Sequence, residues 1–163
     1  SAGHDTTKDA ISGGMRALIE NPDQLARLRD NMDLMPLAVE EMIRWATPVK
    51  EFMRTATADT EVRGVKIAKG ESVYLAYVSG NRDEDVFDDP FRFDVGRDPN
   101  KHVAFGYGVH FCLGAALARM EMNSFFTELV PRLKSVELAG PPQLSATTFV
   151  GGLKHLPIRY EIS

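Results

Sequence analysis

The stretch Phe105-Gly106-Tyr107-Gly108-Val109-His110-Phe111-Cys112-Leu113-Gly114 decides the fold of this chain and contains its only cysteine. Its three glycines permit tight backbone turns and the close approach of a flat ligand. Cys112 comes just before a predicted helix, and the N-terminus of a helix stabilises a thiolate through its dipole and free N–H groups. We interpret the stretch as a loop that offers a thiolate to a metal. The alternative is a glycine-rich loop around a buried thiol, because free cysteine usually behaves as a small hydrophobic residue.

The single cysteine narrows the choice of metal. A structural zinc site needs about four nitrogen or sulfur ligands, and the sequence has neither a second cysteine nor a paired histidine spacing. One thiolate with an open position opposite suits haem iron better. His110, two residues before Cys112, could direct a cation at an anionic group of the same ligand. An intrachain disulfide is excluded.

The composition is that of an ordinary globular protein. The chain has 163 residues, of which 44% are hydrophobic and 26% charged, enough for one domain over residues 1–163. The net charge of -4 argues against a non-specific nucleic-acid surface. No apolar run approaches the length of a membrane span and no signal peptide opens the chain, so we expect a cytoplasmic protein without a membrane partner.

Hydrophobic periodicity predicts a mainly α fold with small β sheets. The first residues fit a helix whose earlier turns are missing, and Asn21-Pro22 and Pro36 begin two further helices. Short β segments follow, and then a long loop rich in Asp, Arg and Pro that aromatic residues would anchor. The remaining expectations are β segments over 52–77, loop anchors at Phe87, Phe91 and Phe93, a helix over about 115–133, and a hairpin that turns at Gly151-Gly152 and closes with 158–162.

Two weaker patterns lie upstream of the cysteine. Glu41 and Arg44 form E-x-x-R on a predicted helix, where side chains at i and i+3 share a face and can pair. Near the start, Ala2-Gly3-His4-Asp5-Thr6-Thr7 offers a carboxylate beside a hydroxyl, a combination suited to proton relay but equally common as a helix cap.

The loop around Cys112 resembles the haem loop of cytochrome P450, F-G-x-G-x-H/R-x-C-x-G, at every fixed position. The resemblance implies the C-terminal, haem-binding portion of the P450 fold, with the N-terminal portion absent. It implies haem b as cofactor, Cys112 as the iron ligand, and a monooxygenase that inserts one oxygen atom of O2 into a C–H bond.

The same resemblance implies roles for the other motifs. Glu41 and Arg44 would lock structurally to Arg97 in the loop before the cysteine. Thr6 would hydrogen-bond the activated dioxygen, and Asp5 would connect its proton to solvent. Arg54 and His110 would bind the haem propionates.

The chain looks most similar to soluble bacterial P450s that hydroxylate terpineol, which implies a small hydrophobic substrate such as a monoterpenoid or an aromatic hydrocarbon. The candidate pocket residues are Val49, Phe52, Phe149 and Val150, although apolar residues there could equally be plain core. Electrons would come from an iron–sulfur ferredoxin, and Arg119 would be either a docking contact or a solvated side chain. A non-catalytic haem-thiolate binding or sensor module is the alternative function, and a fragment that binds no haem stays open.

Overall fold

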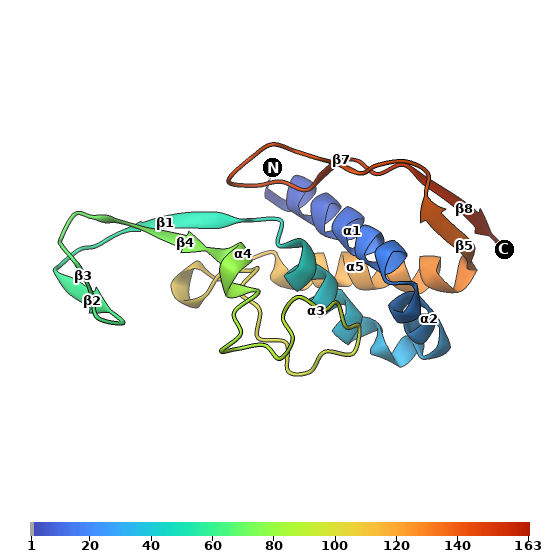
Figure 1. Ribbon diagram of the computed structural model, residues 1–163, viewed down its shortest axis with the longest axis horizontal. Coiled ribbons are helices and arrows are strands. Elements are labelled where there is room, and N and C mark those ends of the chain that lie inside the picture. Colours follow the sequence, from blue (N-terminus) through green and yellow to red (C-terminus); the bar gives the residue numbers. More distant parts are fainter. Residues whose placement is uncertain (1) are drawn as a thin grey trace.

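Helices α1, α3 and α5 pack side by side in the computed structural model, which describes residues 2–163 (Figure 1). Strands β1 to β4 form a narrow arm, the β arm, that extends from one end of this helical body, and the sheet of β5 and β8 lies at the other end (Figure 1). The helices are α1 (Ala2–Glu20), α2 (Pro22–Asp30), α3 (Met35–Ala46), α4 (Tyr77–Gly80) and α5 (Ala115–Leu129), with short 3-10 turns at Met32–Leu34, Gly108–His110 and Val130–Arg132.

Four two-stranded antiparallel sheets accompany the helices: β1 with β4, β2 with β3, β5 with β8, and β6 with β7. The predicted class, mainly α with small β sheets, is therefore confirmed. The strands are β1 (Glu51–Thr55), β2 (Thr60–Val62), β3 (Val65–Ile67), β4 (Ser72–Ala76), β5 (Leu133–Leu138), β6 (Gln143–Leu144), β7 (Leu153–His155) and β8 (Ile158–Ile162).

Two glycines of α1 set how closely it packs on α3. A Cβ atom at Gly14 would lie 2.8–2.9 Å from three side-chain atoms of Met42, and one at Gly13 would lie 2.7 Å from the Cβ of Ala46. The backbone of α1 at these glycines therefore packs directly against side chains of α3. A core of close-packed apolar residues continues from this contact to α5. Its fully buried members include Leu18, Leu28, Val39, Met42, Phe93, Met122 and Phe126.

The helix boundaries follow the prolines. Pro22 occupies the first position of α2 and Pro36 lies in the first turn of α3, where their missing N–H groups cost nothing. Helix α3 ends at Ala46, and the capping residue Thr47 takes a left-handed conformation with φ of 40° directly before Pro48. The helix predicted to reach Leu133 stops at Leu129, because Pro131 interrupts it and the chain then enters β5.

The long loop between α4 and α5 is anchored by two phenylalanines, not three. Phe87 and Phe93 are 3% and 2% exposed, but Phe91 is 69% exposed, so the prediction that Phe91 anchors the loop was wrong. Phe91 lies within the turn at residues 90–92, where its side chain reaches solvent, whereas Phe87 and Phe93 lie before and after this turn and are buried. Asn81 supplies a polar anchor that was not predicted: its fully buried amide accepts from the Val103 N–H at 2.7 Å and donates to Thr47 Oγ1 at 2.9 Å.

The prediction that the last strand, residues 158–162, closes a hairpin turning at Gly151-Gly152 was wrong. Gly151-Gly152 lies in the connection between β6 and β7, and β8 pairs with β5 instead. The pairing follows strand length, because β5 and β8 have six and five residues whereas β6 has two. Val150 still pairs in an isolated bridge, antiparallel with Val49, and so brings this segment to the entrance of β1.

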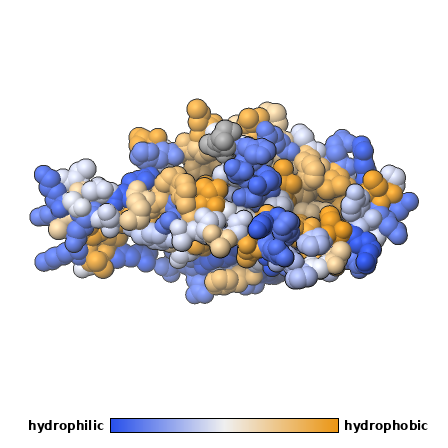
Figure 2. Space-filling model, turned by 90° about the horizontal axis from the view of Figure 1, so that it is seen from above, coloured by the Kyte–Doolittle hydropathy of each residue, from blue (hydrophilic) through white to orange (hydrophobic). Residues whose placement is uncertain are grey.

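The surface mixes charged and apolar side chains, and the arm stands out at one end (Figure 2). Large apolar side chains are exposed in the loop around the cysteine, where Val109 and Leu113 are 97% and 102% accessible. Among residues 2–163, no helix combines the length and the hydropathy needed to cross a membrane.

Candidate haem-thiolate site

The loop that contains Cys112 folds back on itself. Gly106 and Gly108 have φ angles of 74° and 65°, a region that glycine enters without strain. The turn brings the N–H of Cys112 to the carbonyl of Phe105 at 2.9 Å. The carbonyl of Cys112 then accepts from the N–H of Ala115, the first residue of α5, at 3.2 Å. The loop thus places a free, exposed thiol at the entrance to a helix.

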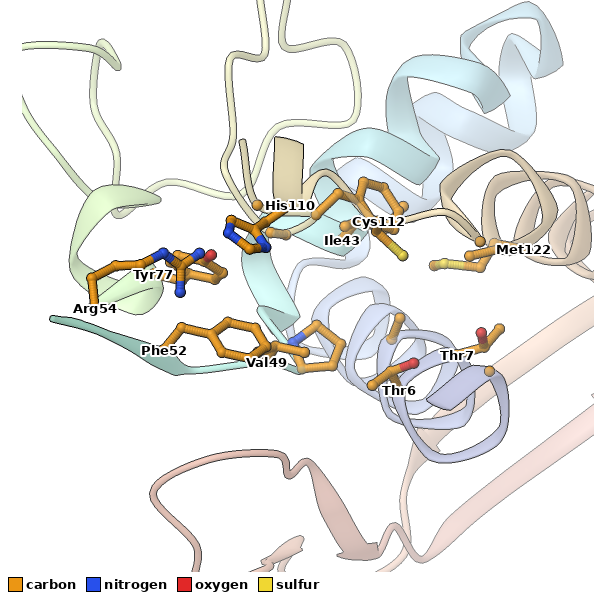
Figure 3. A pocket seen from close by; sticks show the side chains of 18 residues that line it. Thr6, Thr7, Ile43, Val49, Phe52, Arg54, Tyr77, His110, Cys112 and Met122 are labelled. Carbon is orange, nitrogen blue, oxygen red and sulfur yellow. The ribbon is translucent and has the colours of Figure 1, made fainter. Parts of the chain in front are cut away.

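A cavity of about 300 Å³ lies between this loop and α1. Cys112 projects from one wall, and Thr6 projects from α1 on the facing wall (Figure 3). The lining is mainly apolar and comes from five parts of the chain. Its members are Gly3, Thr6, Thr7, Ala10, Ile43, Pro48, Val49, Phe52, Arg54, Tyr77, Ala104, Phe105, Gly106, His110, Cys112, Gly114, Ala118 and Met122.

Two basic side chains occupy one end of the cavity. Arg54 from β1 and His110 from the cysteine loop both line it, with Tyr77 beside them (Figure 3). Arg54 donates from Nη1 to the carbonyl of Met53 at 2.9 Å, and its guanidinium carbon lies 5.9 Å from the ring centre of Phe52. Within the described part of the chain, neither basic side chain forms an ion pair with a carboxylate. Both can therefore receive an anionic group of a ligand.

The predicted proton-relay pair is split between the cavity and the surface. Thr6 lines the cavity, but the Asp5 side chain is 59% exposed and pairs with Lys8 at 3.3 Å. Asp5 does not line the cavity, so it meets solvent directly while Thr6 faces inward. The neighbouring Thr7 is 8% exposed and also lines the cavity, a position that the sequence argument did not single out.

Glu41, Arg44 and Arg97 come together as one buried network. Arg44 donates two hydrogen bonds to Glu41 at 2.7 Å, and Arg97 Nε lies 3.2 Å from the same carboxylate. Glu41 also accepts from the Asp94 N–H at 3.0 Å and from Asn100 Nδ2 at 3.1 Å. The two arginines hold the long loop through its carbonyls, and the acceptors are Asn81, Pro90 and Arg92 for Arg44 and Asp88, Asp89 and Arg92 for Arg97.

The four substrate-pocket candidates fall into two layers. Val49 and Phe52 line the cavity directly. Phe149 lies behind them, with its ring centre 5.3 Å from that of Phe52 in an edge-to-face arrangement. Val150 forms the β bridge with Val49 and does not line the cavity. The backbone completes this second layer, because the N–H of Lys50 donates to the carbonyl of Phe149 at 2.8 Å.

Sequence reasoning missed several residues of the site. Tyr77 and Met122 line the cavity, but each is an isolated residue far from the motifs. Arg119, predicted to be either a docking contact or a solvated side chain, donates two hydrogen bonds to Glu40 and is 37% exposed. His102, which the sequence motifs do not include, has its Nε2 atom 3.0 Å from the same Glu40 carboxylate. Among residues 2–163, no group of three His, Cys, Asp or Glu side chains is placed to hold a metal by itself.

The shape and chemistry of the cavity fit a haem. A porphyrin is a flat apolar ring with an iron at its centre and two carboxylates on one edge. The cavity offers an apolar lining, a thiol on one wall and two basic groups at one end. Cys112 would hold the iron, and Arg54 and His110 would bind the carboxylates.

Comparison with known proteins supports this interpretation. The cytochrome P450 family profile matches residues 1–160. The chain is 55% identical over 160 residues to cytochrome P450-terp of Pseudomonas sp, covering 98% of this chain and 37% of that protein. It is 44% identical over 158 residues to a steroid C26-monooxygenase of Mycolicibacterium smegmatis, covering 96% of this chain and 39% of that protein.

A solved structure shows the same fold. CYP108D1 from Novosphingobium aromaticivorans superposes with a TM-score of 0.94 at 49% identity, over 100% of this chain and 40% of that one. The chain therefore spans about two fifths of the length of the relatives that it matches. With a profile match along nearly its whole length and the haem-loop pattern intact around Cys112, this chain belongs to the cytochrome P450 family.

Proposed function

We propose that the haem-loaded protein is a monooxygenase that hydroxylates a small hydrophobic substrate. The observation that supports this most directly is the placement of Cys112 and Thr6 on facing walls of one apolar cavity. A thiolate on one side and a hydroxyl on the other are what an oxygenase needs, whereas a protein that only carries or senses a ligand has no use for the hydroxyl.

Haem b, when bound, supplies the iron that activates dioxygen. In the overall reaction one oxygen atom enters a C–H bond of the substrate, and the other is reduced to water with two electrons and two protons. The residues of this chain hold the cofactor and supply a hydroxyl for proton transfer. Cys112 donates electron density from its sulfur, and Arg54 and His110 orient the cofactor through its carboxylates. Thr6 donates and accepts protons through its hydroxyl at the facing wall.

Asp5 is the proposed connection of this proton path to solvent. Its carboxylate lies at the surface beside Lys8, one residue before Thr6 on the same helix. We therefore propose that protons pass from solvent through Asp5 to the inner hydroxyl, with Lys8 as the competing partner of the carboxylate.

We propose a monoterpenoid or an aromatic hydrocarbon as substrate. Val49, Phe52 and Ile43 give the cavity apolar walls, and Phe149 supports Phe52 from behind. The name of the Pseudomonas relative, cytochrome P450-terp, agrees with a terpenoid.

We also propose an iron–sulfur ferredoxin as electron donor. Reconstitution with a ferredoxin and its reductase should sustain turnover, and turnover with a flavodoxin alone would contradict that assignment.

The reduced, carbon-monoxide-bound spectrum tests the iron ligand. The wild-type haem-loaded protein should show the red-shifted Soret band of thiolate ligation, and Cys112→Ser should lose it. A spectrum typical of histidine ligation in the wild type would overturn the assignment of Cys112.

The oxygenase function is tested separately through Thr6. Thr6→Ala should uncouple electron consumption from product formation, and Thr6→Ser, which keeps the hydroxyl, should restore most of the coupling. Equal coupling in Thr6→Ala and the wild type would remove Thr6 from the proton path. Thiolate-type spectra without any product from a panel of small apolar substrates would favour the alternative binding or sensor module.

A further inference from the structure

Glu40, Arg119 and His102 form a second charged network, separate from the one around Glu41. The Glu40 carboxylate on α3 accepts from Arg119 Nε at 2.5 Å and from Arg119 Nη2 at 2.8 Å. His102 Nε2 lies 3.0 Å from the same carboxylate, and its Nδ1 accepts from the Ala104 N–H at 3.3 Å. Because Nδ1 accepts, Nε2 carries the proton that His102 donates to Glu40. The three residues tie α3, α5 and the start of the cysteine loop together.

Two members of the network, Arg119 and His102, contact the ring of Phe105. The guanidinium carbon of Arg119 lies 4.5 Å from the centre of this ring, and the ring centre of His102 lies 5.8 Å from it. Phe105 in turn lies 6.2 Å from Phe111, ring centre to ring centre. A guanidinium over an aromatic face is attractive, and the bidentate bond to Glu40 fixes the orientation of the guanidinium plane.

Phe105 connects this network to the thiol. Its carbonyl accepts the hydrogen bond from the Cys112 N–H at 2.9 Å, and its ring forms part of the cavity wall. The path from Arg119 to Cys112 therefore has two contacts, one ring stacking and one backbone hydrogen bond. The pKa of Arg119 is raised chiefly by its hydrogen bond to Glu40, and attraction to the Cys112 sulfur acts in the same direction.

We propose that Arg119, held by Glu40 and His102, is a positioning residue for the thiolate loop. It fixes the ring of Phe105, whose carbonyl holds the Cys112 N–H, and so keeps the loop in the conformation that would present the sulfur to the iron. The inference rests on the proposed role of Cys112 as iron ligand.

The test measures iron ligation in the haem-loaded protein. In reduced, carbon-monoxide-bound samples at a fixed, sub-denaturing urea concentration, the ratio of thiolate-detached to thiolate-ligated Soret bands should rise about tenfold in Arg119→Gln, because the ring of Phe105 loses the guanidinium that holds it. Glu40→Gln should raise the same ratio, and the double variant should differ little from either single one because both remove one interaction. Arg119→Lys keeps the charge but not the bidentate geometry, so an intermediate ratio is expected.

A matched control separates this role from general stability. Arg132→Gln removes an exposed i,i+4 pair with Glu128 and should leave the ratio unchanged. Far-UV circular dichroism at the same urea concentration establishes that each variant is folded. Ratios for Arg119→Gln and Glu40→Gln equal to that of Arg132→Gln would overturn the inference while leaving the ligand assignment intact. A wild-type protein without the thiolate-type band would instead overturn the proposed function itself.

Discussion

Arg44 meets Glu41 in a two-pronged hydrogen bond, Nε to Oε2 and Nη2 to Oε1 at 2.7 Å each, and neither side chain reaches solvent. Positions i and i+3 of a helix share a face, so the guanidinium of Arg44 can form both hydrogen bonds with the carboxylate of Glu41 on α3. Arg44 also donates hydrogen bonds to three carbonyls of the long loop, so the pair acts as the attachment point of that loop.

Removing one partner of this pair should be severely destabilising. Arg44→Ala leaves the Glu41 charge buried and several loop carbonyls without donors, and breaking a buried ion pair typically costs about 3–5 kcal/mol. Urea unfolding followed by circular dichroism measures the loss. Arg159→Ala, which removes the exposed pair with Glu137, is the control and should cost less than about 1 kcal/mol. Similar losses for the two variants would contradict the attachment role.

The Glu40 carboxylate should make the free energy of unfolding depend on pH in the acidic range. Burial alone would raise its pKa, but hydrogen bonds from Arg119 and His102 outweigh burial and lower the pKa from 4.5 to about 2. The stabilisation is therefore complete above pH 4.5 and is lost as the pH falls toward 2, with a total of at most about 3 kcal/mol. Glu40→Gln should be less stable than wild type at pH 7 and should converge with it at pH 2. Glu137→Gln, at an exposed pair, serves as the control, and parallel pH profiles for Glu40→Gln and wild type would exclude this linkage.

The close approach of α1 to α3 should be sensitive to a single methyl group. Gly14→Ala places a Cβ 2.8–2.9 Å from Met42, and overpacking of this kind costs about 1–3 kcal/mol. Gly3→Ala makes the same change on the same helix where nothing lies within 4 Å, so thermal unfolding should show little change. If Gly14→Ala were as stable as Gly3→Ala, the two helices would have more freedom than the structure indicates.

Phe52 should set the affinity for apolar ligands. Its ring lines the cavity and lies between Phe149 and Tyr77, at centre distances of 5.3 and 5.9 Å. Phe52→Ala removes this surface and should weaken ligand binding by about tenfold or more, since burying an aromatic side chain contributes about 1.5–3 kcal/mol. Titration of the iron spin-state change gives the dissociation constant. Tyr74→Ala alters the same arm without touching the cavity, and an equal effect there would point to arm stability rather than contact.

Local sequence patterns predicted the parts of the site that depend on local geometry. The glycines at 106 and 108 take the positive φ angles that the turn requires, and Glu41 and Arg44 meet because helical spacing forces them together. The distant member, Arg97, was placed only through resemblance, since nothing in its neighbours indicates which helix it contacts.

The errors concern contacts between distant segments. The partner of β8, the exposure of Phe91 and the bond from Arg119 to Glu40 depend on tertiary packing, which periodicity does not encode. The local pattern of β8 does not say whether β5 or β6 is its partner, and an arginine on a helix has the same local pattern whether it is solvated or paired. The cavity-lining role of Tyr77 is of the same kind, because it follows from where α4 docks.

The β arm has a consequence for how the protein opens. Each of its sheets is two strands wide, and Met53, Tyr74, Val62 and Val65 are all more than half exposed. A two-stranded ribbon is marginal in water, so this arm is a low-stability unit that unfolds before the helical body does. Phe52 and Arg54 belong to its first strand, so partial unfolding would remove the proposed contact of Arg54 with the cofactor's carboxylates while the cysteine loop before α5 is still intact.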